Sequence, residues 1–207
     1  MGRSILDAAR ELFVTHGYQH VSIRKIAERI EYSPAAIYGY FPSKDDIFFA
    51  LAEEGFRLLF TTAGPAPDGM DPIEHLRRMF WHYYEFSKQH PEYFALMFLD
   101  RNVPQISRNW DRFGFVGEMK HDMVMRIQDA IDRGALPSGT SPIAVFRVLL
   151  AAIHGVATLR LCDRLASGED GDALARATLE AAMKGLQAGA LLNASLGPYP
   201  EDVRHDS

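Results

Sequence analysis

Apolar residues recur at helical spacing along most of the chain. The first run is Ile5, Ala8, Ala9, Leu12 and Phe13, and it stops at Gly17, as expected of a helix that ends in glycine. Similar runs predict longer helices over residues 44–62, 72–89, 91–99, 104–133, 141–165 and 172–196. Because no segment shows the strict alternation of a strand, the pattern predicts an all-α fold.

Two very short helices are predicted between the first run and residue 44. Ser22, Ser33 and Ser43 are helix-capping residues, and Pro34 occupies a first helical position, where no N–H is required. These signals predict helices over 23–30 and 34–39. Two short helices joined by a tight turn and preceded by an amphipathic helix are typical of a helix-turn-helix, whose second helix enters the major groove of DNA.

The charge distribution agrees with a DNA-binding N-terminal region. The net charge is −5 for the whole chain, but residues 1–44 carry +2 and the rest carries −7. If the apolar residues of this region form its core, the following side chains remain outside, where DNA phosphates would lie: Arg24, Lys25, Tyr38, Tyr40 and Lys44.

At this point the chain resembles a known family. The motif Ile5-x2-Ala8-Ala9-x2-Leu12-Phe13-x3-Gly17-Tyr18-x2-Val21-Ser22-Ile23-Arg24-x-Ile26-Ala27, followed by Ser33-x3-Ile37-Tyr38-x-Tyr40-Phe41-x2-Lys44-x2-Ile47, is similar to that of TetR-type transcriptional regulators. The resemblance implies a three-helix DNA-binding domain and a helical-bundle domain for ligand binding and dimerisation. It also implies that Ser22, Tyr38, Tyr40 and Lys44 contact the DNA backbone. His154-Gly155 resembles a pair found in one subgroup, although Leu150 stands where that subgroup has tryptophan.

The predicted recognition helix lacks Arg, Lys, Asn and Gln, which normally read guanine and adenine. It offers the Ser33 hydroxyl as a hydrogen-bonding group. Pro34, Ala35 and Ala36 offer apolar surface for thymine methyl groups, and Gly39 permits close approach of the backbone to the bases. Arg24 is then the best candidate to read a guanine, with an ordinary phosphate contact as the alternative. Glu31 stands where the family usually has a glycine in the turn, so either it adopts a positive φ or the turn differs.

Three parts of the chain are expected. Residues 1–48 form the DNA-binding domain, residues 49–196 form the helical ligand-binding and dimerisation domain, and residues 197–207 form a disordered tail. The Gly- and Pro-rich stretch 63–71 is the main break in helical pattern, and the helix before it connects the domains.

Aromatic and methionine residues are concentrated in the middle of the chain. Such residues usually form core, but here they occupy more than one face of their helices, which favours an adaptable apolar cavity. The predicted lining is Trp81, Tyr84, Phe98, Trp110, Phe113 and Met123, with His82 or His154 as a polar anchor. Each of these residues has an ordinary structural role as its alternative.

The last two helices carry small residues and, in the final helix, two apolar faces. One face of that helix contains Leu174, Ala177, Ala181 and Gly185, and the other contains Leu179, Met183 and Leu186. Two apolar faces need two partners, which predicts a homodimer through these helices. Residues 143–162 have the length of a membrane span, but three basic residues favour a buried helix and no membrane association.

We therefore predict a cytoplasmic, homodimeric repressor that an apolar or aromatic small molecule releases from double-stranded operator DNA. An activator or a ligand-independent binder is the alternative within this class. From another class, a helical-bundle metalloenzyme remains, because Glu118-x2-His121 and His82-x2-Glu85 have ligand spacing, but no second matching pair accompanies them. Cys162 is the single cysteine, and no catalytic motif appears, so we expect no enzyme activity, metal or cofactor.

Overall fold

The computed structural model describes residues 1–61, 69–100, 103–104 and 114–190. The described residues form helices and no strands, which confirms the all-α prediction. The elements, in order, are α1 (Gly2–His16), the 3-10 turn η1 (Tyr18–His20), α2 (Ile23–Arg29), α3 (Pro34–Tyr38), α4 (Lys44–Thr61), α5 (Pro72–Gln89), α6 (Pro91–Phe98), α7 (Gly114–Asp132), α8 (Pro142–Leu161) and α9 (Gly171–Gln187).

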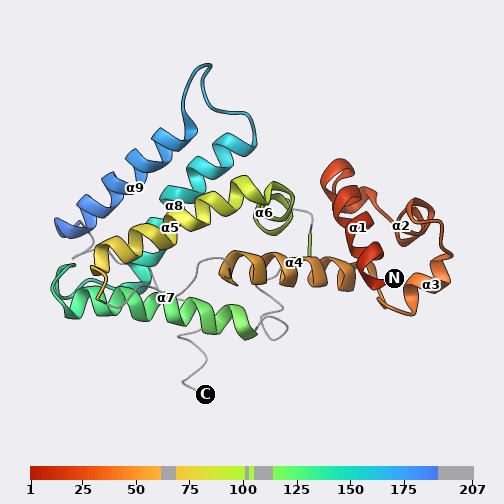
Figure 1. Cartoon of the computed structure of the whole chain (residues 1–207), viewed down its shortest axis with the longest axis horizontal. Helices are drawn as coiled ribbons and strands as arrows, with labels where there is room; N and C mark the ends of the chain where they lie inside the picture. Colours follow the sequence, from red (N-terminus) through yellow and green to blue (C-terminus); the bar gives the residue numbers. More distant parts are fainter. Residues whose placement is uncertain (62–68, 101–102, 105–113, 191–207) are drawn as a thin grey trace.

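The first three helices pack into a small unit at one end of the molecule (Figure 1). Its core contains the buried faces of α1, α2 and α3 together with the start of α4, and Tyr18 closes it with its ring 5.1 Å from Phe13 and 5.6 Å from Phe48. The turn η1, which the sequence pattern did not predict, brings Tyr18 into this position. The unit therefore has its own apolar core, with the surfaces of α2 and α3 left outside.

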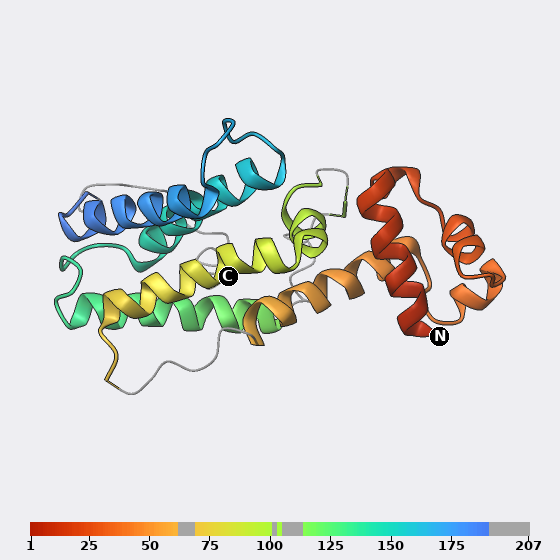
Figure 2. The ribbon, with the colours of Figure 1, turned by 45° about the horizontal axis from the view of Figure 1, so that its top comes forward.

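Helix α4 runs from this unit toward the helical bundle (Figures 1 and 2), so it belongs to both parts. Helix α6 lies across α1 and α4. Arg10 of α1 donates a hydrogen bond of 2.7 Å to the Tyr93 hydroxyl of α6. Gly55 of α4 allows close packing, because a Cβ there would lie 2.4 Å from the Met97 sulfur. The bundle thus contacts the N-terminal unit through α6 as well as through α4.

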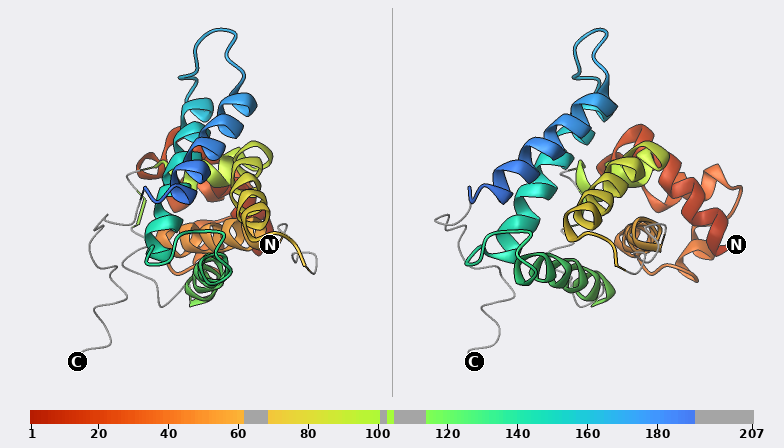
Figure 3. Two further views of the ribbon diagram at one scale, coloured as in Figure 1. Left: turned by 90° about the vertical axis from the view of Figure 1, so that its left-hand side faces the viewer. Right: turned by 60° about the vertical axis from the view of Figure 1, so that its left-hand side comes forward.

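Helices α5, α7, α8 and α9 form the body of the bundle, with α8 and α9 side by side at the end far from α1 to α3 (Figures 1 and 3). Helix α8 has the length and hydropathy of a membrane span, with a mean hydropathy of 1.8. It packs against α5, α7 and α9, and Val145, Leu149 and Ile153 on it are fully buried. In this structure one side of the helix packs into the bundle core, and 33% of its apolar window is buried.

Some predicted helix ends are wrong. Helix α8 ends at Leu161 rather than near residue 165, because Asp163 adopts a φ of 51° that a helix does not allow. Helix α9 ends at Gln187, and Gly189 follows with a φ of 84°. The predicted continuation to residue 196, the tail 197–207 and the segment 105–113 of the predicted helix 104–133 lie outside the described residues.

Candidate nucleic-acid interface and ligand cavity

Helices α2 and α3 begin at the predicted serine caps. The Ser22 hydroxyl accepts the Lys25 N–H at 3.2 Å, and the Ser33 hydroxyl accepts the Ala36 N–H at 3.2 Å. Each hydroxyl keeps its own hydrogen as a donor, so capping and donation to an acceptor on DNA are compatible. The caps therefore fix the two helices and leave two donors at their exposed N-termini.

Helix α3 turns one side inward and presents the rest to solvent. Ile37 is fully buried and anchors the helix, whereas Tyr38 and Tyr40 are 55% and 52% exposed. Ser33, Pro34, Ala35 and Gly39 are exposed and Ala36 is half-buried. Tyr32, in the turn before α3, is 46% exposed and was not predicted from the sequence as a surface residue. The structure thus places all the predicted residues of the recognition helix on one accessible end of the molecule.

Arg24 is exposed on α2, where its side chain is 80% accessible. Its Nε donates to Glu28 at 2.9 Å, one turn along the same helix. An exposed pair of this kind contributes little to stability, so the guanidinium is available to a stronger partner.

Lys44 differs from the prediction that it would lie outside. It is half-buried, its Nζ donates to the Tyr18 carbonyl at 2.9 Å, and it lies 4.0 Å from the centre of the Tyr18 ring. Burial lowers the pKa of Lys44, opposed by the nearby Asp45 carboxylate. The reason for the difference is η1, which turns the Tyr18 carbonyl toward the start of α4. Lys44 therefore has a structural partner before any phosphate is considered.

Glu31 adopts the positive φ that the sequence left as one of two options. Its φ is 58°, and the Tyr32 N–H then donates to the Ala27 carbonyl at 2.9 Å to close the end of α2. The helix-turn-helix turn is therefore made with a residue that has a Cβ at a position that favours glycine.

The bundle contains a cavity of about 870 Å³, a size typical of small-molecule sites. Much of its lining is apolar and comes from α4, α5, α6, α7 and α8; examples are Phe56, Leu59, Phe98, Met119 and Leu150. The rings of Phe56 and Phe98 meet edge to face at 6.0 Å. Because Phe56 lies beside Gly55 and Phe98 ends α6, the cavity wall includes the elements that contact the N-terminal unit.

Four of the predicted ligand residues line this cavity: Trp81, His82, Phe98 and Met123. Within it, His82 Nε2 donates to the Leu59 carbonyl at 2.9 Å, so this histidine already has a hydrogen-bond partner. Trp110 and Phe113 lie outside the described residues.

Two predicted ligand residues are not in the lining. Tyr84 is fully buried, and its hydroxyl donates to Asp172 of α9 at 3.0 Å. His154 Nδ1 lies 2.9 Å from the Tyr83 hydroxyl, and its ring stacks on Phe94 at 5.5 Å. Burial lowers the pKa of His154. Partners distant in sequence turn these two side chains toward α9 and α6, whereas Tyr83 reaches the cavity instead.

Among the described residues, no three His, Cys, Asp or Glu side chains gather as metal ligands. Glu118 and His121 are both exposed on α7, and His82 contacts a backbone carbonyl. Among the described residues, no further metal ligand accompanies the Glu118 and His121 pair or the His82 and Glu85 pair. The described part of the chain therefore does not support the metalloenzyme alternative.

Comparison with known families identifies both parts of the molecule. Residues 5–51 match the model of bacterial regulatory proteins of the tetR family, and residues 76–182 match the model of the tetracyclin repressor-like C-terminal domain. The chain belongs to the TetR family. This confirms the resemblance that the first fifty residues carry, while the subgroup with a His-Gly pair stays a prediction.

Curated relatives of this TetR-family chain match over part of its length. An HTH-type transcriptional repressor of Mycobacterium tuberculosis is 44% identical over 52 residues, which are 25% of this chain and 28% of the relative. The HTH-type transcriptional repressor KstR of Rhodococcus jostii is 37% identical over 76 residues, 36% of this chain and 35% of the relative. The chain thus matches between a quarter and about a third of the length of these relatives.

Solved structures match over nearly the whole chain. A protein of unknown function from Rhodococcus sp. RHA1 has a TM-score of 0.71 at 24% identity, covering 90% of this chain and 95% of that one. The fatty acid degradation regulator FadR of Bacillus halodurans has a TM-score of 0.66 at 16% identity, covering 91% and 95%. At these identities the likeness shows that the TetR-family chain shares their fold.

The TetR-family bundle leaves one face of α8 and α9 open. On α9, Leu179, Met183 and Leu186 are buried, whereas Ala177 and Ala181 of the other predicted face are exposed. On α8, Ala151, Gly155 and Leu159 are exposed, and Leu159 is 41% accessible. A Cβ added at Gly155 would meet no atom within 4 Å. The chain's own packing therefore uses only one of the two apolar faces of α9.

Proposed function

We propose that this TetR-family chain is a transcriptional repressor that acts as a homodimer and leaves its operator when a small molecule fills the bundle cavity. The observation that carries the proposal is the shared element between the two sites. Helix α4 begins in the helix-turn-helix unit and supplies Phe56, Leu59 and Phe60 to the cavity. A molecule bound in the cavity therefore contacts the helix on which the DNA-binding unit rests.

DNA contact is assigned to the accessible end of α2 and α3. Ser22, Tyr38, Tyr40 and Lys44 hold phosphates in this proposal, and Arg24 reads a base or holds a further phosphate. Ser33, Pro34, Ala35, Ala36 and Gly39 approach the base edges. Two observations support this assignment. Tyr38 and Tyr40 are exposed, and the hydroxyl groups of Ser22 and Ser33 keep a hydrogen to donate at the N-termini of α2 and α3. For Lys44, contact with phosphate requires one of its two remaining N–H groups, because the first is held by Tyr18.

The exposed face of α8 and α9 is assigned to the partner copy. Small residues on both helices allow two helix pairs to approach closely and form a four-helix interface. A dimer is also what DNA recognition needs, since two recognition helices must enter successive major grooves. In this proposal residues 1–48 form the DNA-binding domain and residues 49–196 form the ligand-binding and dimerisation domain, with α4 crossing the boundary. The protein acts in the cytoplasm.

The effector acts by its differential affinity for two arrangements of the dimer. Phe56 and Phe98 meet at the cavity wall, and the same helices meet at Gly55 and Met97. A bound molecule that separates the first pair favours a different position of α6 against α4. Release from DNA follows if the displaced recognition helices miss the spacing of two major grooves.

The test is fluorescence anisotropy of labelled DNA from upstream of the protein's own gene. We expect saturable binding that survives excess random DNA, and a weaker affinity in the presence of apolar compounds that raise the melting temperature. Binding no stronger than to random DNA would contradict the proposal. Reduced transcription from that DNA in a reporter separates a repressor from an activator, and stabilising compounds without effect on the DNA complex would favour a ligand-independent binder.

A further inference from the structure

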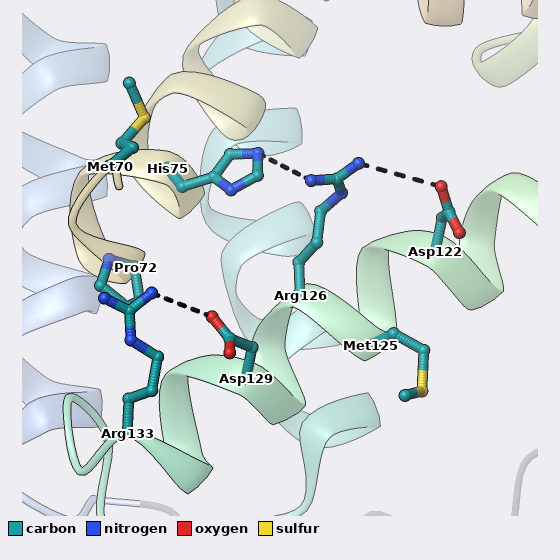
Figure 4. A pocket seen from close by; sticks show the side chains of 8 residues that line it. All are labelled: Met70, Pro72, His75, Asp122, Met125, Arg126, Asp129 and Arg133. Atoms are coloured by element: carbon teal, nitrogen blue, oxygen red, sulfur yellow. Dashed lines mark hydrogen bonds and ion pairs between the residues drawn. The ribbon is translucent and has the colours of Figure 1, made fainter. Parts of the chain in front are cut away.

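A smaller surface pocket of about 280 Å³ lies beside the large cavity, between the start of α5 and helix α7. Four residues line both spaces: Met70, His75, Asp122 and Arg126. We call this set the mouth. Figure 4 shows His75 on α5 and Arg126 on α7 directed toward one another across it. The mouth is thus a mainly polar boundary that the surface pocket shares with the mostly apolar cavity.

The positive charge of the Arg126 guanidinium is offset only weakly by its neighbours at the mouth. Its Nη1 lies 3.3 Å from His75 Nε2, and its Nη2 lies 3.9 Å from Asp122, whose side chain is 73% exposed. A long, exposed ion pair contributes little and is easily exchanged. The next carboxylate, Asp129, is paired with Arg133 at 3.3 Å instead (Figure 4). Most of the charge of Arg126 is therefore available to a ligand.

Arg78 adds a positive charge close to the mouth; it lines the large cavity, as do Arg77, Lys120 and Arg176. It follows His75 by one helical turn on α5, and its Nη1 lies 3.9 Å from the Met70 sulfur. It forms no ion pair with any residue in the described part of the chain. Burial lowers the pKa of His75, and Arg126 and Arg78 lower it further, opposed by Asp129. Both guanidinium groups thus act on the same imidazole, which places their positive potential at the mouth.

We infer that the effector is an elongated apolar molecule with a carboxylate at one end, whose apolar part fills the large cavity and whose carboxylate binds Arg126 of the mouth and the neighbouring Arg78. A guanidinium group binds a carboxylate through charge-assisted hydrogen bonds, often two at once. The apolar walls that the other end requires include Phe56, Leu59 and Met119. The inference rests on the proposed function, because it assumes that the cavity holds an effector.

Other ligand classes fit the mouth less well. A cation would meet both arginines, whereas most carboxylates that line the two spaces are already paired: Glu74 and Glu180 with Arg77, Glu85 with Lys88, and Asp129 with Arg133. A neutral apolar molecule would fill the interior but would leave Arg78 without a partner, and it would cover charged groups that now face water. A carboxylate at the mouth supplies the missing negative charge and keeps it near solvent, where desolvation costs least.

The test compares dodecanoate with dodecan-1-ol by isothermal titration calorimetry on the full chain. The variants are Arg78→Gln and Arg126→Gln. Arg133→Gln is the matched control, because Arg133 carries the same charge, lies outside the mouth and is already paired with Asp129. We expect dodecanoate to bind wild type and the control with the same affinity. It should bind Arg78→Gln and Arg126→Gln at least about tenfold more weakly. The affinity for dodecan-1-ol should change less than about twofold in every variant, and Arg126→Lys should retain part of the dodecanoate affinity.

Three results would overturn the inference. Equal affinity of wild type for the acid and the alcohol would remove the role of charge, and an equal loss in Arg133→Gln would show a general electrostatic effect. Failure of wild type to bind dodecanoate would exclude the ligand class. Anisotropy with upstream DNA on the same preparations separates these failures from that of the proposed function, because a folded wild type that binds its DNA but neither ligand contradicts only the inference. Circular dichroism verifies that each variant is folded.

Discussion

At the residue scale, Glu31 shows how a departure from the family pattern is accommodated. The turn requires a left-handed residue to bring the Tyr32 N–H onto the Ala27 carbonyl, and Glu31 supplies it at a φ of 58°. A residue with a Cβ is less stable than glycine in this conformation, by up to about 1–2 kcal/mol. The sequence was sufficient to locate the strain but not to show whether the turn had changed shape.

We predict that Glu31→Gly raises the free energy of unfolding by roughly 0.5–1 kcal/mol, because the lost strain outweighs the added freedom of the unfolded chain. Urea denaturation measures the change. The matched control is Glu28→Gly, which places the same substitution inside α2 and should destabilise by about 1 kcal/mol. A lower midpoint for Glu31→Gly would show that the Glu31 side chain has a stabilising contact.

Arg24 can be assigned to a base or to a phosphate by one substitution. If it reads a guanine, Arg24→Ala costs roughly 1–3 kcal/mol at one G·C position in each half-site and relaxes the preference there alone. Affinities for a set of single-base operator variants measure this. Uniform weakening at every position would assign Arg24 to the phosphate backbone.

At the scale of elements, most helix beginnings could be predicted and several side-chain partners could not. Asp71 and Ser141 cap α5 and α8 by accepting backbone N–H groups at 3.0 and 3.4 Å, which are local contacts that short motifs specify. The partners of Tyr84 and His154 lie 88 and 71 residues away along the chain. Spacing along one helix therefore predicted an apolar cluster but not which side chains enter the cavity.

The open face of α8 and α9 predicts a dimer that depends on Gly155. Gly155→Trp adds a ring on this face without a clash inside the chain, because a Cβ there meets no atom within 4 Å. We expect the variant to sediment as a folded monomer. Gly114→Trp, at an exposed and equally open position on α7, is the control and should remain dimeric. A dimeric Gly155→Trp protein would place the interface elsewhere.

The attachment of α9 to α5 should weaken in acid. Lys88 and the Tyr84 hydroxyl bind Asp172 at 2.7 and 3.0 Å, and the Lys88 contact is the main cause that lowers the pKa of Asp172 below 3.8. A lowered carboxyl pKa stabilises the fold above its ordinary value and loses that effect as pH falls through the lowered value. Asp172→Asn should therefore lower the free energy of unfolding by about 1 kcal/mol at pH 7.

This difference between wild type and Asp172→Asn should shrink as the pH falls below about 4, because the carboxyl group then takes up a proton in the unfolded chain before it does so in the folded protein. Urea titrations between pH 7 and pH 3 measure it. A difference that stays constant over this range would show that the amide disturbs packing at the start of α9 and that the charge of Asp172 has no part in it.

At the scale of the whole molecule, the N-terminal unit was predicted more completely than the bundle. The helix-turn-helix is encoded within about fifty consecutive residues, so its caps, core and exposed side are visible together in the sequence. The mouth and the neighbouring Arg78 bring together residues from α5 and from the middle of α7. None of His75, Arg78 and Arg126 belongs to a short sequence motif that would mark it as a ligand contact. These residues became candidates only when the fold placed them around one opening.

The central claim is that this TetR-family chain recognises DNA as a symmetric dimer. Selection of binding sites from a random DNA library by the full chain tests it most directly. The account predicts enrichment of an inverted repeat whose half-sites are separated by about one helical turn, roughly 10 base pairs, or a multiple of it. A selected pool that is indistinguishable from the starting library, or a single site without two-fold symmetry, would contradict the account.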